Sequence, residues 1–204
     1  MKIIDVRQRS DEWLALRRGA ITGTKLKNII PLRGTTPKIG YYELIAERLA
    51  TEPTDESPMQ RGTRLEEEAT EAFEKHSGLK VEQVGLCVRD DNENIAVSPD
   101  GLIKEEEKYT GAIEIKCLSS AKHLEAYIER KIPKEYHFQI LQNFIVNDDL
   151  ESLHFVFYDP RVTCMPLHTI DVEREQLEDE IEERRAYQEN MLEEVETICL
   201  NLGF

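Results

Sequence analysis

The sequence predicts an α/β fold in which helices flank a central mixed β-sheet. Apolar residues recur at helical spacing in several segments, and short runs with two-residue alternation lie between them. Length is the other observation: the 204 residues, 40% of them hydrophobic, suffice for one domain with a substantial core. No linker, repeat or low-complexity tract divides the chain. We therefore expect residues 1–204 to form a single domain.

The first expected helix is short. Ser10 caps its start before Asp11-Glu12-Trp13, and Gly19 ends it. A longer helix is expected over residues 62–77, ending at Gly78. The other expected helices cover residues 24–30, 41–50, 119–130, 134–146 and 173 to about 202.

The expected sheet contains strands over residues 81–88, 95–98, 101–104, 111–117, 152–158 and 165–172. The charged segment from Lys104 to Thr110 is expected to form a hairpin tip. On the last helix, apolar residues recur at three- to four-residue steps or their multiples: Leu177, Ile181, Met191, Val195, Ile198 and Leu202. This stripe suits either an oligomer seam or packing within the chain, and we favour the second because Arg184, Arg185 and Gln188 interrupt it.

Two short motifs carry the chemistry. Ser98-Pro99-Asp100-Gly101 reads as a turn after a strand, and Glu114-Ile115-Lys116 lies on the next long strand. Side chains two apart on a strand point the same way, so Glu114 and Lys116 share a face on which they can meet Asp100. Alone, each motif has an ordinary explanation, a turn or a solvated ion pair. Together and in this order they indicate a metal-dependent nuclease.

The expected cofactor is Mg²⁺, with Mn²⁺ as a substitute, because carboxylate oxygens suit these hard cations. The backbone carbonyl of Ile115 would supply another oxygen. Two ions per site would polarise the scissile phosphate and stabilise the leaving oxygen. Lys116 would position or help to deprotonate the attacking water.

The chain resembles the lambda exonuclease and YqaJ group of phage recombination nucleases, within the PD-(D/E)XK superfamily and its restriction-endonuclease-like fold. Six segments carry the resemblance in the family's order: WLALRRGAIT (13–22), RGTRLE (61–66), SPDGL (98–102), EIKC (114–117), YHFQI (136–140) and YDPR (158–161). The resemblance implies that Asp100, Glu114 and the Ile115 carbonyl bind metal and that Lys116 is the catalytic lysine.

The resemblance also assigns roles that the residues alone leave open. Glu66 matches an additional acidic residue, although Glu67 and Glu68 follow it and acidic runs usually serve solubility. Gln139 matches a glutamine that orders the nucleophile or the scissile phosphate, although Gln142 shares its predicted helix.

The same resemblance implies a pocket for the terminal 5′-phosphate of DNA. Arg17, rather than its neighbour Arg18, matches the arginine that grips this phosphate. Thr24 stands where the family often has serine, and Ser98 is the other small hydroxyl near the pocket.

The implied function is a 5′-to-3′ exonuclease on linear double-stranded DNA that releases 5′-mononucleotides and leaves a 3′ single strand for recombination. Implied partners are DNA ends, two further subunits in a homotrimeric ring, and a single-strand annealing protein, or synaptase. Two alternatives stay open: a structure-selective or endonucleolytic member of the superfamily, and a noncatalytic acidic adaptor with the same fold.

Net charge is the main objection to a DNA enzyme, because the chain carries a formal charge of −15 and polyanion binders are usually basic. Its distribution softens the objection, since residues 1–40 hold nine Lys and Arg against three Asp and Glu. No apolar run approaches the roughly 20 residues that span a bilayer. Four scattered cysteines are expected to be reduced and partly buried. We therefore expect a protein of the bacterial host's cytoplasm, without membrane attachment.

Overall fold

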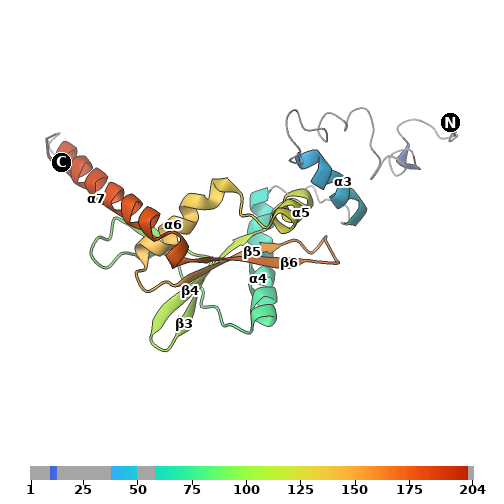
Figure 1. Cartoon of the computed structure of the whole chain (residues 1–204), viewed down its shortest axis with the longest axis horizontal. Coiled ribbons are helices and arrows are strands. Elements are labelled where there is room, and N and C mark those ends of the chain that lie inside the picture. Colours follow the sequence, from blue (N-terminus) through green and yellow to red (C-terminus); the bar gives the residue numbers. More distant parts are fainter. Residues whose placement is uncertain (1–9, 13–37, 50–57, 202–204) are drawn as a thin grey trace. The chain divides into compact units, whose positions relative to one another are not determined.

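The computed structural model describes residues 10–12, 38–49 and 58–201 (Figure 1). The chain divides into two compact units. The first takes its described residues from 1–65, 117–131 and 157–168, and the second from 66–116, 132–156 and 169–204. The single domain expected over residues 1–204 stays a prediction.

The main sheet has four strands in the order β3-β4-β5-β6 (Figure 1). They are β3 (Gly101–Glu105), β4 (Lys108–Lys116), β5 (Ser152–Tyr158) and β6 (Leu167–Glu173). β3 and β4 are antiparallel. The Glu151 N–H donates to the Thr110 carbonyl at 2.8 Å, so β4 and β5 begin at the same edge and run parallel. The Arg174 N–H donates to the Glu151 carbonyl at 2.9 Å, so β6 ends where β5 begins and is antiparallel to it. The sheet is therefore mixed, as predicted.

Two predicted strands do not join this sheet. β1 (Cys87–Val88) and β2 (Ala96–Val97) pair only with each other. The prediction of a strand over residues 81–88 is wrong before Cys87, where only Glu82 bridges to Leu102. The physical reason is spacing: Val81 and Val84 are three positions apart, which breaks the two-residue alternation that a half-buried strand needs.

The described part of the first unit includes the helices α3 (Ile39–Leu49) and α5 (Ser120–Glu129). They lie within two residues of the predicted bounds. Their shared core is formed by Tyr42, Ala46, Ala121, Leu124 and Val162. Ser119 caps α5 by accepting a hydrogen bond from the Lys122 N–H, which satisfies one of the free donors of the first turn. The predicted helix at Ser10 is helical at residues 11 and 12 and then leaves the described residues, as does the one over 24–30.

The long helix α4 (Pro58–Ser77) begins four residues before the predicted start and ends as predicted. Gly78 follows it with φ 78°, a left-handed conformation that favours glycine, and its N–H donates to the Glu74 carbonyl at 2.9 Å. In the second unit, α6 (His137–Val146) follows a 3₁₀ turn over Lys134–Tyr136. One side of α6 is buried: Ile140, Leu141, Phe144, Ile145 and Val146.

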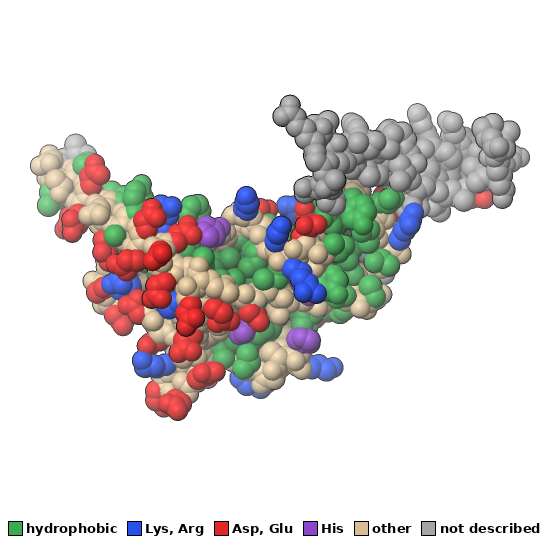
Figure 2. All heavy atoms as spheres, viewed as in Figure 1, with side chains coloured by type: hydrophobic (Ala, Val, Ile, Leu, Met, Phe, Trp, Pro, Cys, Tyr) green, Lys and Arg blue, Asp and Glu red, His purple; other side chains and the backbone are tan. Residues whose placement is uncertain are grey.

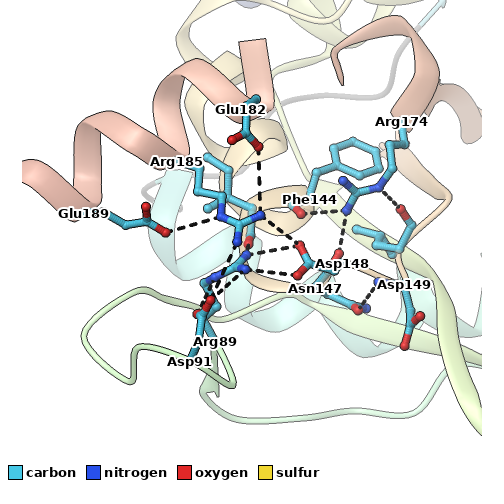
Figure 3. Close-up of polar contacts among 12 residues, drawn as sticks. Arg89, Asp91, Phe144, Asn147, Asp148, Asp149, Arg174, Glu182, Arg185 and Glu189 are labelled. Carbon is cyan, nitrogen blue, oxygen red and sulfur yellow. Dashed lines mark hydrogen bonds and ion pairs between the residues drawn. The ribbon is translucent and has the colours of Figure 1, made fainter. Parts of the chain in front are cut away.

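Two arginines complete the C-terminal end of α6, where backbone carbonyls lack helical partners (Figure 3). Arg89 donates to the Ile145 carbonyl at 2.6 Å and to the Asp148 carboxylate at 3.0 and 3.1 Å. Arg174 donates to the carbonyls of Phe144 and Asn147 at 2.7 and 2.6 Å. Cations are favourable at this end of a helix. These contacts fix α6, which carries Gln139.

The last helix, α7 (Glu178–Asn201), contradicts the packing that we favoured for its apolar stripe. Ile181 is buried, whereas Met191, Val195 and Ile198 are 44%, 49% and 50% exposed. The intramolecular prediction is therefore wrong for Met191, Val195 and Ile198, which no described segment of the chain covers, while Leu202 lies outside the described residues. Asp and Glu side chains gather along α7 and at the tip of the β3–β4 hairpin (Figure 2).

The prediction about the cysteines is confirmed only in part. The four cysteines are free, as predicted, but Cys164 and Cys199 are exposed rather than partly buried. Among the described helices, none is long and apolar enough to cross a bilayer.

Candidate active site

Asp100 lies at the entry to β3, one residue before Gly101 pairs with Ile113 of β4. Its Oδ2 accepts a hydrogen bond of 2.6 Å from the Ile115 N–H. The structure thereby brings Asp100 to the end of β4, beside the Glu114-Ile115-Lys116 motif, as the sequence predicts. The metal-binding role of the Ile115 carbonyl stays a prediction.

Gly101 is needed for close packing at this point. A Cβ built on Gly101 would lie 2.2 Å from Cγ1 of Val81, far inside van der Waals contact, and 3.2 Å from Cγ1 of Ile113. The Asp-Gly pair therefore does more than form a turn, because the missing side chain lets the Val81 segment approach the strand that follows Asp100.

Glu114 and Lys116 share one face of β4 and form an ion pair. The pair is not the solvated one that strand motifs usually represent, since the two side chains are only 9% and 17% exposed. The Lys116 ammonium also lies 4.9 Å from the ring centroid of Tyr136, within cation–π range. Tyr136 opens the YHFQI segment, and its contact with Lys116 has no signal in local sequence.

Glu66 differs in burial from the two glutamates that follow it. Glu66 is half-buried, whereas Glu67 and Glu68 are exposed. Burial raises the pKa of Glu66, and the charge of Asp100 raises it further while that of Lys116 lowers it. Glu66 therefore lies within electrostatic reach of the two motifs, although it comes from α4.

The three carboxylates share a deficit of positive charge. Burial raises the pKa of Asp100, against the Ile115 hydrogen bond and the charge of Lys116, which lower it. Burial also raises the pKa of Glu114, Lys116 lowers it, and the charges of Asp100 and Glu66 raise it. Among the residues that the structure describes, one ammonium therefore faces three carboxylates that are half-buried or buried, which is costly unless another cation joins them.

The donor set fits a divalent metal by its chemistry, since oxygen ligands and excess negative charge are what Mg²⁺ or Mn²⁺ requires. Among the residues that the structure describes, no group of three or more His, Cys, Asp or Glu side chains stands ready-made as a metal cage. Mg²⁺ commonly takes one or two protein carboxylates and completes its shell with water and phosphate oxygens.

Gln139 and Ser98 line a cavity of about 380 Å³ together with Glu114. The structure also distinguishes the two glutamines of α6. The Gln142 amide donates to the Ala96 carbonyl at 3.1 Å and exchanges hydrogen bonds with Gln188, so it is engaged. The Gln139 side chain is exposed and forms no hydrogen bond within the described part of the chain. This arrangement favours Gln139 over Gln142 as a ligand-facing group.

Of the three residues expected in the phosphate pocket, Ser98 alone lies within the described part of the chain. Ser98 is exposed on the cavity wall. Arg17 and Thr24 lie outside the described residues, as does most of the basic segment over residues 1–40.

A second charged cluster, in the first unit, gives a structural role to Arg61 of the RGTRLE segment and to Asp159 and Arg161 of the YDPR segment. Asp159, fully buried, accepts hydrogen bonds from Arg61 at 2.7 Å, from Ser120 at 2.5 Å and from Arg161 through its backbone N–H and its guanidinium. RGTRLE and YDPR thus meet at one carboxylate. Local pattern gives no sign of this, because Arg61 and Asp159 are 98 positions apart.

Comparison with known proteins places this geometry in a family. The profile of the YqaJ-like viral recombinase domain matches residues 12–149. An alkaline exonuclease (LHK-Exo) from Laribacter hongkongensis is 29% identical with a TM-score of 0.58, covering 95% of this chain and 100% of that one. LHK-Exo in complex with dAMP is 30% identical with a TM-score of 0.60, covering 95% and 98%. No curated protein matches the chain at a significant level. These likenesses confirm the predicted resemblance and the fold class, a mixed sheet flanked by helices as in PD-(D/E)XK nucleases.

Proposed function

The chain belongs to the YqaJ-like viral recombinase family, and from that premise we propose that it is a Mg²⁺-dependent 5′-to-3′ exonuclease acting on ends of linear double-stranded DNA. Family membership supports the coarser statement, a nuclease role in recombination. The observation that carries the proposal is the cluster of Asp100, Glu114 and Glu66, for which Lys116 supplies the one ammonium found among the described residues.

Each of these side chains has a distinct task in hydrolysis. Asp100 and Glu114 would hold the metal ions, Asp100 being oriented by the Ile115 N–H. When bound, two Mg²⁺ ions would polarise the scissile phosphate and acidify a water molecule. Lys116, held by Glu114 and the Tyr136 ring, would position the attacking water, and Glu66 would accept a hydrogen bond or assist the second ion.

The bond changes define the products. The oxygen of water forms a bond to phosphorus, the bond between phosphorus and the 3′ oxygen breaks, and that oxygen takes a proton. A 5′-mononucleotide leaves, and the shortened strand carries a new 5′-phosphate. Arg17, with Thr24 and Ser98, would hold this phosphate and so select the next bond. Gln139 would order the water or the scissile phosphate from the cavity wall.

The remaining parts of the proposal rest on the family alone. They are the homotrimeric ring around DNA, the annealing protein that takes up the 3′ strand, and the cytoplasm of the bacterial host as the site of action. A ring would retain DNA between cycles and make a small enzyme processive.

The test uses linear duplex DNA with a 5′-phosphate at one end and a 5′-hydroxyl at the other, incubated with Mg²⁺ or with EDTA. We expect metal-dependent loss of the strand with the 5′-phosphate and release of 5′-mononucleotides. Lys116→Ala should abolish it, while Lys80→Ala, a change at a lysine that is 86% exposed, should not.

Two outcomes would favour the alternatives. Efficient cutting of sealed plasmid by the wild type, with no preference for 5′-phosphorylated ends, would favour an endonuclease. Absence of any hydrolysis with Mg²⁺ or Mn²⁺ would favour the noncatalytic adaptor.

A further inference from the structure

The cavity beside the candidate active site has two kinds of wall. Val97, Ser98 and Glu114 come from the strands and the turn that precedes Asp100. The other wall belongs to α6 and is formed by Phe138, Gln139, Gln142 and Asn143. The volume of about 380 Å³ lies within the range of small-ligand sites, roughly 300–1,000 Å³.

Phe138 is the unexplained residue of this wall. Its side chain is 67% exposed, whereas Phe144, two turns along the same helix, is fully buried. One exposed apolar residue is normal on a protein surface. Phe138 differs because its ring lines the same cavity as Glu114, next to Gln139, so it faces whatever molecule is brought to the carboxylates.

The surroundings of the ring restrict the chemistry of its partner. The carboxylate of Glu114 on the opposite wall repels a bare phosphate, which needs bound cations to approach it. A nucleobase is uncharged, flat and has two π-faces, so it can approach an acidic wall without this penalty. Base–aromatic stacking contributes about 1–3 kcal/mol per base and tolerates every base.

We propose that Phe138 stacks on a nucleobase of the strand whose phosphodiester lies at Asp100 and Glu114. The inference rests on the proposed nuclease function and identifies the part of the DNA that enters the cavity. Phe138 acts as a positioning residue: the stacked base fixes the nucleotide, and Gln139, one residue along, meets its phosphate. Because stacking does not read hydrogen bonds, the contact favours a nucleotide over bare backbone without selecting a sequence.

The test is a double-mutant cycle between the ring and the base. Two linear duplexes are compared. One has intact terminal nucleotides, and in the other the first two nucleotides at the 5′ end are abasic. On intact ends Phe138→Ala should lower kcat/KM by roughly 5- to 150-fold, the equivalent of one stacked base. On abasic ends the wild type and Phe138→Ala should be equal, and Phe138→Trp should restore activity on intact ends. Tyr187→Ala, at a tyrosine of α7 that is 57% exposed, is the matched control and should match the wild type.

A readout without hydrolysis separates this inference from the proposed function. In a Lys116→Ala background with Mg²⁺, 2-aminopurine at the 5′ end should be quenched on binding, and Phe138→Ala should remove the quenching. If the wild type digests DNA but Phe138→Ala lowers kcat/KM equally on intact and abasic ends, or not at all, stacking is wrong. If Phe138→Ala changes the sedimentation of the free protein and leaves the quenching intact, the ring belongs to a subunit interface and the inference is overturned. If the wild type digests no DNA in any metal, the proposed function fails first.

Discussion

Two charged clusters in the described part of this chain have opposite charge balances. In the first unit, the single carboxylate of Asp159 accepts hydrogen bonds from two guanidinium groups and a hydroxyl. In the described part of the second unit, Asp100, Glu114 and Glu66 share one ammonium, that of Lys116.

The difference teaches how to separate a structural cluster from a reactive one. A buried carboxylate surrounded by cationic donors has its charge compensated and holds segments together. A group of carboxylates with too little positive charge is destabilising as it stands, and it becomes favourable when a divalent cation binds. The same substitution in the two clusters should therefore have opposite consequences.

The largest expected effect is on activity. Asp100→Asn keeps an oxygen that can accept the Ile115 hydrogen bond but removes a charge from the cluster. We expect kcat/KM on linear duplex DNA to fall about 10²- to 10⁴-fold, because metal-assisted chemistry loses a ligand charge. The free energy of unfolding of the metal-free protein should not fall. Wild-type activity in this variant would show that Asp100 does not belong to the reacting group.

The second effect is on stability. Asp159→Asn leaves Arg61, whose side chain is 7% exposed, and Arg161 without their counter-charge. Breaking a buried pair in this way costs about 3–5 kcal/mol, which we expect to see as a lower urea midpoint with an unchanged slope. A change below about 1 kcal/mol, the level of surface ion pairs, would mean that the cluster is not structural.

The third effect concerns the backbone that carries Asp100. Gly101→Ala places a methyl group 2.2 Å from Val81, so the neighbouring segment must move. Overpacking of this kind costs about 1–3 kcal/mol. Gly62→Ala is the control, since no atom lies within 4 Å of a Cβ built there. If both variants unfold at the same urea concentration, the close approach is not a constraint.

The smallest effect is a pH dependence. Because the pKa of Asp100 is raised in the folded protein, the folded state binds more protons than the unfolded state between the two pKa values. The stability cost of its charge is thus largest at neutral pH and disappears as pH falls through the folded pKa. The difference in unfolding free energy between Asp100→Asn and the metal-free wild type should favour the variant at pH 7.5 and shrink toward pH 4. A difference that grows as pH falls would contradict a raised pKa of Asp100 in the folded protein.

The sequence anticipates what depends on local pattern. The strand over Ser152–Tyr158 has the predicted bounds because an apolar run with β-branched and aromatic residues specifies it locally. The end of α4 at Gly78 follows from one residue's conformational freedom. Glu114 and Lys116 share a face because alternation on a strand is geometric.

Other features depend on tertiary contacts that no local pattern encodes. The RGTRLE and YDPR segments meet only in the folded chain. Residues 81–86 contain enough apolar side chains to suggest a strand. Their spacing does not match a strand, and Leu86 is 68% exposed, so this segment is not packed as a strand of the sheet. The stripe of α7 has the right period for burial, yet Val195 and Ile198 stay half exposed because no described segment covers them. The choice of Glu66 among three glutamates came from the family resemblance, and the burial pattern supports the same residue.

The most direct test of the central claim, that the second cluster is completed by a divalent cation, is calorimetric titration of the metal-free protein with Mg²⁺ and Mn²⁺. We predict saturable binding that Asp100→Asn weakens at least about tenfold, the loss of one ligand charge, while Glu67→Gln, at the exposed neighbour of Glu66, leaves it unchanged. The free energy of unfolding should rise in parallel, by about 2.7 kcal/mol at a metal concentration 100 times Kd. Absence of binding, or binding that Asp100→Asn does not alter, would contradict the account.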